Sequence, residues 1–578
     1  DRVALTLRDG HRHDLVVEDA VLILREEGAG VGGTDDDLPT LVIWHGKGDP
    51  RLQSQQQVEE QRDKTYSYLA EYRVAEKKFI RLADDELRDV TLAPRERYAV
   101  GSDRRAYERR DNIDGGQRRD LYVIDLVTGG RTLAVKTARY PWQPSPDGTK
   151  ALYYDDGNYH VYDFTTKSAR NLTAGAPTSF IDTEDDHNVD RPPVQPLGWA
   201  SDNQHVLLFD NWDVWKAPVK GGALVNLTGN GKKDRIRYTR RLVFNPKERG
   251  IDLTRPMYLQ TYGEWTKKEG LSVVQPLKTG AQSLLWDDAK YFVSRARDAE
   301  TWTFTRQTVQ QFPDYWVSEK TLASPRRLTD ANPQQKDFAW SSGARLVDYV
   351  SDKGDTLQGA LYLPANYEPG KKYPTVVYIY EKLSQGLHQY AVPNETRAFN
   401  PSIYTSRGYA VLQPDIVYKL NDPGMSSVWC VVPAVKAAIA TGIVDPANVG
   451  LHGHSWGGYQ SSFLATQTGT LFKSIVTGAP LPGGRLPRAG RQSCGITDGA
   501  ARTAGAERVG RAHAVAKPAN AKIGHAFARH LELRRQRLLS GRAAAQELGG
   551  IADQQGTARP GAATGGPVAA QADHHPIA

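Results

Sequence analysis

Short apolar runs separated by turn residues occupy most of the chain between residues 15 and 330, and their order recurs. One unit contains the turn 144–148, apolar runs at 151–154 and 159–163, and a closing Asn-Leu-Thr at 171–173. A second unit follows the same plan from Trp199 to Thr228. Runs of this length between turns predict strands, and repeated sets of such strands are typical of β-propeller blades. We therefore predict a β-propeller over residues 1–335.

The spacing of these units is uneven. The closing triplets that begin at Asn171 and Asn226 are 55 residues apart, whereas propeller blades usually repeat every ~40 to 50 residues. Insertions between strands would account for the difference. An array of β-sandwiches is the alternative.

From residue 336 the apolar runs become stronger and are separated by segments of helical length. The expected elements are a helix at 428–440 and strands at 346–350, 358–363, 375–380, 410–414, 449–452 and 474–477. Strands that alternate with helical lengths indicate a mostly parallel sheet covered by helices on both faces. We predict an α/β domain over residues 336–481.

Residues 482–578 differ from the rest of the chain in composition. Phe527 is their only aromatic residue, and Ala, Gly and Arg make up about half of them. Because the segment contains no apolar run long enough for a buried strand, we predict an anomalous tail that is disordered or derived from a frameshift. The net charge of this segment is +8, so it accounts for the net charge of +7 of the whole chain. Since almost no aromatics are interleaved with its arginines, we predict no nucleic-acid partner.

A Gly-x-Ser-x-Gly sequence, Gly453-His454-Ser455-Trp456-Gly457, follows an apolar strand and precedes a stretch compatible with a helix. In a sharp strand-to-helix turn a serine hydroxyl points out of the sheet, and small neighbours let backbone and substrate approach closely. Ser455 is therefore the candidate nucleophile. The backbone amide of Trp456, at the helix start, is a candidate donor to the oxyanion. The alternative is a glycine-rich turn with an incidental serine.

A propeller-like region followed by an α/β domain with Gly-His-Ser-Trp-Gly-Gly-Tyr at 453–459 resembles the prolyl oligopeptidase family of serine peptidases. The resemblance covers residues 1–481 and is strongest at 343–481. It implies an N-terminal β-propeller that caps an α/β-hydrolase domain, with peptides of limited size as substrates. It also implies that Ser455 is acylated during the reaction and that no cofactor takes part.

The family's second oxyanion donor is a tyrosine hydroxyl at the end of an early hydrolase strand, and Tyr380 closes the apolar run 375–380. A phenol can donate to a developing negative charge without carrying a charge itself. The chain departs from the family at the next two positions, where Glu381 and Lys382 replace a glycine pair. A core tyrosine at a strand end is the alternative for Tyr380.

A serine nucleophile needs a histidine that accepts its proton and an acid that orients the histidine. Since α/β-hydrolases carry the acid and then the histidine after the serine, both are expected in the tail. Asp553 and His574 lie at plausible positions, but neither follows an apolar strand, so we treat the match as coincidental and assign neither residue. The abrupt change in composition is what a shifted reading frame would produce. We predict that the hydrolase domain is truncated after the strand that follows the nucleophile.

Three weaker patterns do not change this interpretation. The run 28–33 satisfies Gly-x-Gly-x-x-Gly, but three aspartates rather than a helix follow it, so we predict no dinucleotide site. The histidines at 11–13 and the group at 185–187 lack spaced partners, so we predict no metal. The pairs Glu26-Glu27 and Glu59-Glu60 are similar to the acidic pair with which dipeptidyl-peptidase relatives hold a substrate amino terminus. Adjacent glutamates are common on protein surfaces, so these pairs do not distinguish an exopeptidase from an endopeptidase.

Compartment and oligomeric state stay open as well. No uninterrupted apolar run reaches the ~18 to 20 residues of a membrane span; the best candidate, 429–444, contains a proline and a lysine. Cys430 and Cys494 cannot form a disulfide framework. The chain begins at Asp1 with no initiator methionine or signal-peptide pattern, so we expect that the true amino terminus is missing or already removed. A cytoplasmic and an exported protein therefore both stay open.

Together these observations predict a serine-type peptidase that hydrolyses short peptides through an acyl-enzyme on Ser455. Two alternatives remain. The first is an esterase or other acyl hydrolase on the same fold, since a fold and a nucleophile do not determine the leaving group. The second is a binding protein with a propeller and a catalytically dead hydrolase domain.

Overall fold

The computed structural model describes residues 2–6, 12–16, 22–27, 51–185, 190–319, 321–394 and 396–480. The chain divides into two compact units, Asp1–Arg511 and Ala512–Ala578, and all described residues lie in the first. The predicted tail at 482–578, with its candidate acid and histidine, lies outside the described residues.

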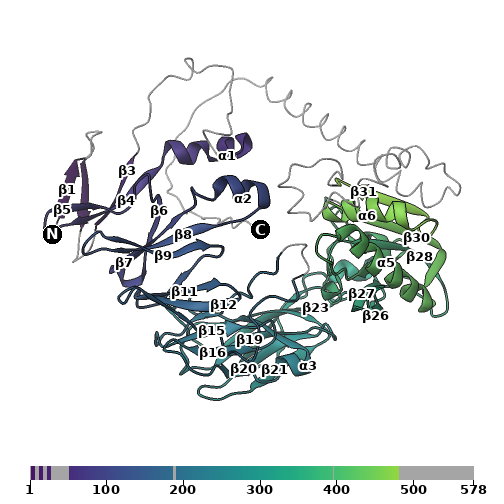
Figure 1. Ribbon diagram of the computed structural model, residues 1–578. Helices are drawn as coiled ribbons and strands as arrows, with labels where there is room; N and C mark the ends of the chain where they lie inside the picture. Colours follow the sequence, from purple (N-terminus) through teal and green to yellow (C-terminus); the bar gives the residue numbers. More distant parts are fainter. Residues whose placement is uncertain are drawn as a thin grey trace, which may run out of the picture. The chain divides into compact units, whose positions relative to one another are not determined.

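The first part of the chain forms small antiparallel sheets whose strands follow one another in sequence (Figure 1). The described residues contain five sheets of four strands each, preceded by a three-stranded and a two-stranded sheet. The two-stranded sheet contains β1 (Arg2–Thr6) and β2 (Arg12–Val16). The three-stranded sheet contains β3 (Leu22–Glu27), β4 (Ser67–Arg73) and β5 (Lys78–Arg81). The first two four-stranded sheets contain β6 (Asp89–Leu92), β7 (Tyr98–Asp103), β8 (Arg119–Asp125) and β9 (Arg131–Ala138), then β10 (Gln143–Pro144), β11 (Lys150–Asp155), β12 (Asn158–Asp163) and β13 (Ser168–Asn171). The third contains β14 (Gly198–Trp199), β15 (His205–Phe209), β16 (Val214–Pro218) and β17 (Val225–Asn226). The fourth and fifth contain β18 (Ile236–Arg241), β19 (Met257–Gly263), β20 (Glu269–Val274) and β21 (Ala281–Asp287), then β22 (Lys290–Arg295), β23 (Thr301–Gln307), β24 (Asp314–Glu319) and β25 (Arg326–Arg327).

Each four-stranded sheet packs against the next through buried apolar side chains. Val123 and Tyr153 share one cluster between the first two of these sheets, and Leu152 and Val206 share another between the second and third. Because alternate residues of a strand point to opposite faces, Leu152 and Tyr153 serve two different interfaces. A series of four-stranded meanders packed face to face is the architecture of propeller blades.

Insertions between strands explain the uneven spacing of the repeat. Residues 172–197 separate β13 from β14, and the β7–β8 connection contains helix α2 (Glu108–Asp114). Short helices occur at other connections: α1 (Gln53–Lys64), η2 (Pro94–Glu96), α3 (Gly231–Asp234) and η3 (Pro333–Asp337).

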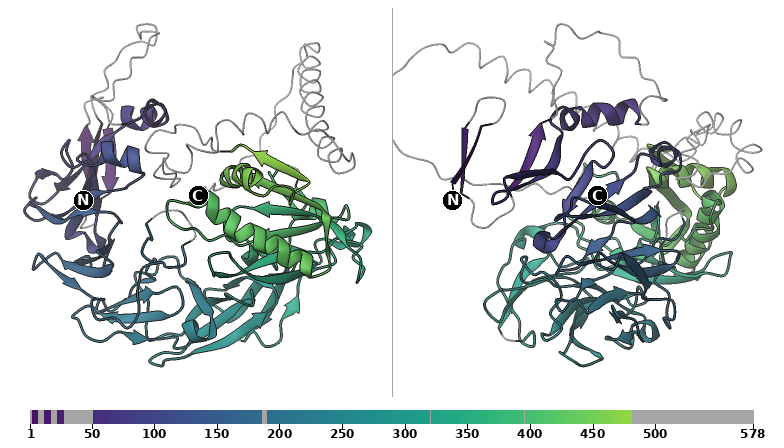
Figure 2. Two further views of the ribbon diagram at one scale, coloured as in Figure 1. Left: turned by 45° about the vertical axis from the view of Figure 1, so that its right-hand side comes forward. Right: turned by 60° about the vertical axis from the view of Figure 1, so that its left-hand side comes forward.

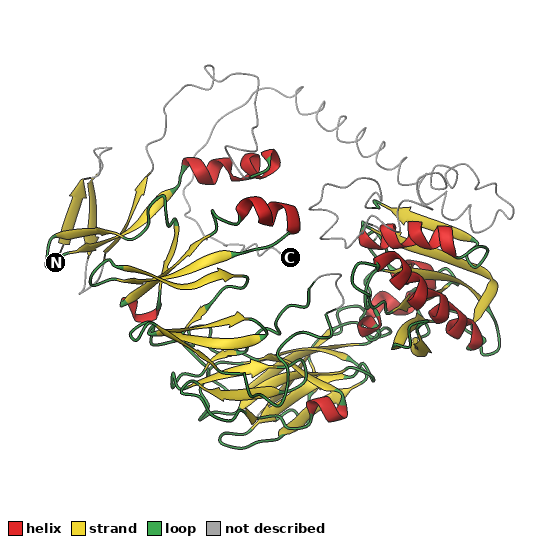
Figure 3. Ribbon diagram, in the orientation of Figure 1, coloured by secondary structure: helices red, strands yellow, loops and turns green. Residues whose placement is uncertain are grey.

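The rest of the described chain forms one six-stranded mixed sheet flanked by helices (Figure 3). The strand order is β26-β27-β29-β28-β30-β31, and the last four strands in this order run parallel to one another. β27 pairs antiparallel with both of its neighbours, β26 and β29. The elements are β26 (Ala344–Val350), β27 (Thr356–Tyr362), β28 (Tyr373–Ile379), η4 (Ser384–Gly386), α4 (Pro401–Thr405), β29 (Ala410–Pro414), α5 (Pro423–Ala440), β30 (Val444–His454), α6 (Trp456–Gln467) and β31 (Ser474–Gly478).

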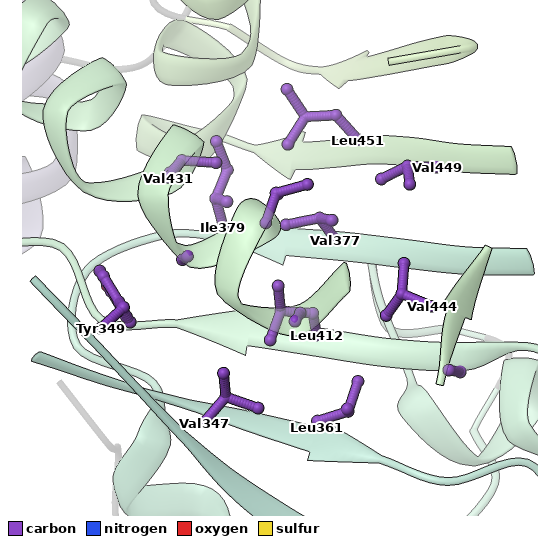
Figure 4. Close-up of a cluster of buried hydrophobic side chains, with 14 of the residues drawn as sticks. Val347, Tyr349, Leu361, Val377, Ile379, Leu412, Val431, Val444, Val449 and Leu451 are labelled. Carbon is purple, nitrogen blue, oxygen red and sulfur yellow. The ribbon is translucent and has the colours of Figure 1, made fainter. Parts of the chain in front are cut away.

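The core of this region lies between the sheet and α5. Val377, Leu412 and Leu451 from three adjacent strands are at most 1% exposed, and they meet Val431 from the helix (Figure 4). α5 also contacts α6, so the helix that follows Ser455 is supported from both the sheet and α5 (Figure 2).

Helix α5 tolerates a proline in its interior because the carbonyl group that the proline leaves without a donor has another partner. Pro433 has no amide hydrogen, so it cannot donate to the carbonyl of Trp429. The amide of Asp352 donates to that carbonyl at 2.9 Å instead. Among the described helices, α5 is long and apolar enough to cross a membrane, and half of it is buried inside the protein.

Every strand expected in 336–481 corresponds to one of β26 to β31, and the helix expected at 428–440 lies within α5. The domain boundaries at 335/336 and 481/482 stay predictions. The truncation after β31 also stays a prediction, since it depends on residues outside the described part.

Candidate active site

Ser455 lies in a sharp turn between β30 and α6. Its backbone has φ 55° and ψ −117°, a combination that is strained for a residue with a side chain. Its amide donates to the carbonyl of Gly478 at 2.9 Å, and its carbonyl accepts the amide of Tyr459 at 3.1 Å. These bonds to β31 and α6 hold the strained turn in place.

The glycines around Ser455 are required by close backbone contacts. A Cβ on Gly453 would lie 1.9 Å from the carbonyl oxygen of Gly457, and a Cβ on Gly457 would lie 2.3 Å from that of Ile379. A Cβ on Gly458 would lie 2.5 Å from the carbonyl oxygen of Gly478. α6 can therefore approach the ends of β28 and β31 only because these residues lack side chains, as the motif predicts.

The two candidate oxyanion donors lie beside this turn. Trp456 is the first residue of α6, where amide groups have no partner within the helix. Tyr380 directly follows β28, and its ring Cδ2 would lie 3.6 Å from a Cβ on Gly457. The structure therefore brings Ser455, Trp456 and Tyr380 together, and their roles stay predictions.

Tyr418 connects these residues and was not identified from the sequence. Its hydroxyl donates to the carbonyl of Tyr380 at 2.9 Å and accepts the indole N–H of Trp456 at 2.8 Å. The side-chain amide of Gln460 also donates to this hydroxyl. Tyr418 follows β29 in a segment without regular pattern, so only the tertiary contacts reveal its place.

A buried aspartate fixes the loop that begins at Tyr380. The carboxylate of Asp415 accepts the amides of Leu383 and Ser384 at 2.8 Å each, and the Ser384 hydroxyl at 2.6 Å. Burial raises the pKa of Asp415, and the nearby charge of Lys267 partly opposes this effect. Asp415 directly follows an apolar strand, and polar residues at the ends of parallel strands gather at one edge of the sheet. This position was the sequence signal that could have identified Asp415 as a residue near the site.

Among the described residues, no imidazole or carboxylate forms a hydrogen bond with the Ser455 hydroxyl. His452 lies three positions earlier but packs edge-on against Tyr378 and Phe399, with ring centroids 5.6 and 5.4 Å away. Burial, with a smaller contribution from His454, lowers the pKa of His452 to about 4. His452 is therefore a neutral core residue.

Most of the weaker candidates lie outside the described residues or on the surface. The glycine run 28–33 and His11 lie outside the described residues, as do the side chains of His13, Glu26 and Glu27. Glu59 pairs with Arg51 and Arg62 along α1, which is a surface arrangement. Within the described part of the chain, no three His, Cys, Asp or Glu side chains gather as metal ligands would.

Residues 424–482 match the model of the prolyl oligopeptidase family, and they contain β30, Ser455, α6 and all of α5 except its first residue. The match to this family of serine peptidases in this segment agrees with the resemblance found in the sequence.

Similar curated proteins are the dipeptidyl peptidases 8 of Mus musculus and Homo sapiens. The chain is 28% identical to the mouse protein over 192 residues, which are 30% of this chain and 19% of that protein. It is also 28% identical to the human protein, over 187 residues. The chain thus spans about a fifth of the length of these curated relatives.

A solved structure from Bacteroides ovatus, assigned as a dipeptidyl aminopeptidase IV, is similar with a TM-score of 0.51. The sequence identity is 14%, and the match covers 74% of this chain and 70% of that chain. At this identity the likeness establishes the fold alone. A β-propeller followed by an α/β-hydrolase domain is confirmed, in place of an array of β-sandwiches.

Proposed function

We propose that this chain is a serine-type peptidase that hydrolyses short peptides through an acyl-enzyme on Ser455. The observation that carries this proposal is the strained backbone of Ser455, between glycines that accept no side chain. Strain of this kind persists only where the surrounding structure holds it, and it is concentrated at functional sites.

The proposed reaction has two steps. The Ser455 oxygen attacks the carbonyl carbon of the scissile bond, its proton passes to a base, and the base then protonates the departing amine. Water subsequently hydrolyses the ester formed on Ser455 and releases the carboxylate product. During both steps the negative oxygen would accept hydrogen bonds from the Trp456 amide and the Tyr380 hydroxyl.

The base is a histidine oriented by an acid, and the order of residues in this fold places both after Ser455. The described part of the chain supplies neither. The position of Tyr380 is supported independently, since Tyr418 holds its carbonyl and Asp415 holds the loop that follows it.

Labelling with a fluorophosphonate probe tests the proposal directly, because the probe reacts only with an activated serine. We expect one modified peptide that contains Ser455, and no labelling of Ser455→Ala. Ser462→Ala is the matched control, because Ser462 lies in α6 and donates only to the carbonyl of Gly458. Absence of labelling in the folded wild-type chain would contradict the proposal.

A catalytically dead binding protein is the second candidate, and the missing partner of the Ser455 hydroxyl among the described residues favours it. Peptide binding that Ser455→Ala leaves unchanged, without product release, would support this candidate. A burst of product from a chromogenic peptide would exclude it. Hydrolysis of chromogenic esters but not peptides would instead indicate an esterase.

A further inference from the structure

Contacts within the hydrolase domain hold the backbone of the loop 380–384. The hydroxyl of Tyr418 and the amide of Ile416 donate to the first two carbonyl groups of this loop, at 2.9 and 3.2 Å. The carboxylate of Asp415 accepts the amides of the last two residues at 2.8 Å each. The middle residue is Lys382, and its side chain reaches a different part of the molecule.

The side chain of Lys382 contacts the propeller. Its ammonium group donates to the backbone carbonyl of Glu184 at 3.2 Å and lies 3.5 Å from the carboxylate of the same residue. Glu184 belongs to the insertion 172–197 between β13 and β14. Lys382 stands where the family has a glycine, and a glycine could not make this contact. One side chain of this chain thus joins a propeller insertion to the loop that begins at Tyr380.

The propeller holds Glu184 in place for this contact. The amide of Glu184 donates to the carboxylate of Asp182 at 3.0 Å, and the amide of Asp182 donates to the carbonyl of Pro192 at 2.7 Å. The guanidinium group of Arg237 in β18 lies 3.5 Å from the carboxylate of Glu184 and 2.6 Å from that of Glu264. Lys382 therefore meets a carboxylate whose position other contacts already restrict.

A buried lysine of the propeller approaches the end of the same loop. Lys267, in the turn between β19 and β20, is 4% exposed and donates to the carbonyl of Glu264 at 2.6 Å. Burial lowers the pKa of Lys267, and the charge of Asp415 is the largest opposing effect. Since Asp415 holds the last two amides of the loop, charges of the propeller lie near both its middle and its end.

We propose that Glu184 and Lys382 are positioning residues, whose contact fixes the loop 380–384 and thereby the hydroxyl of Tyr380 beside the oxyanion. This inference rests on the proposed peptidase function. A pair of partly exposed charges adds little to global stability, because the lost side-chain freedom offsets the attraction. A small displacement of an oxyanion donor, in contrast, changes the reaction rate strongly. Loss of the contact should therefore affect the reactivity of Ser455 far more than folding.

The rate of fluorophosphonate labelling of Ser455 in the full chain tests this proposal. Lys382→Met keeps the apolar stem and removes the charge, and we expect about tenfold slower labelling, a part of the about 10²–10³-fold that a lost oxyanion donor costs. Lys382→Arg keeps the charge and should retain most of the rate. Lys371→Met is the matched control, because Lys371 pairs with Glu368 at 3.6 Å before the other end of β28. Equal rates in Lys382→Met and the wild type would overturn the proposal.

A double-mutant cycle tests whether the two residues act through each other. Glu184→Gln should slow labelling less than Lys382→Met, because the carbonyl of Glu184 remains as an acceptor. The double variant should be no slower than Lys382→Met alone. Raising the salt concentration from about 0.1 to about 1 M shortens the Debye length from about 10 to about 3 Å, so it should slow the wild type more than Lys382→Met. Additive losses and equal salt dependence would contradict the proposal.

Hydrogen exchange separates this inference from the peptidase proposal. The amides of Leu383 and Ser384 report on the order of the loop whether or not Ser455 reacts. We expect them to exchange faster in Lys382→Met than in the wild type and Lys371→Met, with unchanged exchange in β30. An unlabelled wild type would contradict the peptidase proposal, while faster exchange in Lys382→Met would still support the ordering of the loop by Glu184. Unchanged exchange in Lys382→Met would overturn that ordering.

Discussion

At the scale of single residues, Gly457 shows how a tertiary contact overrides a helix preference. In an isolated helix, replacing glycine by alanine is favourable by about 1 kcal/mol. Here the added Cβ would lie 2.3 Å from the carbonyl oxygen of Ile379, which is backbone and cannot rotate away. The glycine is therefore required for the approach of α6 to β28.

We predict that Gly457→Ala destabilises the protein by about 1 to 3 kcal/mol, the usual cost of overpacking. The same displacement of α6 should slow fluorophosphonate labelling of Ser455. Denaturant unfolding and labelling rates measure the two effects. Gly175→Ala is the control, because a Cβ there meets nothing within 4 Å. Equal stability of both variants would show that α6 adjusts freely.

His452 provides a prediction about pH. An unfolded histidine titrates near pH 6.5, whereas burial holds the pKa of His452 at about 4. Between these values the unfolded chain binds a proton that the native protein does not, so native stability falls as the pH is lowered from about 6.5 to about 4. The full difference corresponds to about 3 kcal/mol.

His452→Leu should remove this part of the pH dependence, because leucine does not titrate. The measurement is the free energy of unfolding of both proteins at several pH values between about 4 and 7. We expect the wild type to lose stability relative to the variant as the pH falls. Parallel curves would mean that His452 is already accessible to protons in the native protein.

At the scale of elements, contacts around Tyr418 determine how α6 sits against the loop after β28. Its hydroxyl joins the Tyr380 carbonyl, the Trp456 indole and the Gln460 amide. Since Gln460 is fully buried, loss of this acceptor leaves a donor without compensation from water.

We predict that Tyr418→Phe lowers the free energy of unfolding by about 1 to 2 kcal/mol. It should also slow labelling of Ser455, since the carbonyl of Tyr380 loses its donor. Tyr409→Phe is the matched control, because the Tyr409 hydroxyl forms no hydrogen bond with the described residues. If Tyr418→Phe changes stability but not the labelling rate, the position of Tyr380 does not depend on this hydroxyl.

Elements with a strong apolar pattern were the ones predicted from the sequence. Strands β26 to β31 were expected because each is an apolar run between breakers, and α5 was expected for the same reason. Strand β18, with the sequence Ile-Arg-Tyr-Thr-Arg-Arg, and the polar helix α1 carry no such pattern and were not identified. Their places depend on neighbouring elements rather than on their own composition.

At the scale of the whole molecule, the sequence predicted which residues come together only where one motif contains them or a family resemblance names them. Ser455 and Trp456 belong to one turn, and Tyr380 was placed by resemblance. The contacts of Asp415 and Tyr418 join segments far apart in the chain, and no local pattern encodes them. The same holds for the contacts between the last blade and the hydrolase sheet, where Tyr390 is central.

Tyr390 joins these two parts through several contacts at once. Its amide donates to the side chain of Gln307 in β23 at 2.9 Å, and its hydroxyl donates to that of Gln335 in η3 at 2.9 Å. Its ring stacks on Trp340 with centroids 4.8 Å apart, and it is only 5% exposed. A large aromatic side chain in such a position contributes to the stability of both parts.

We predict that Tyr390→Ala destabilises the protein by about 3 to 5 kcal/mol, as the loss of a buried aromatic ring usually does. Because the ring packs edge-on against Phe312 of the last blade, with centroids 5.4 Å apart, as well as on Trp340, calorimetry should show a wider or divided unfolding transition in the variant. Hydrogen exchange in β23 and in β27 should then report different opening energies. Tyr315→Ala is the control, since this side chain of β24 is 57% exposed and should leave the transition unchanged. A single transition at the wild-type temperature in Tyr390→Ala would show that other contacts hold the two parts together.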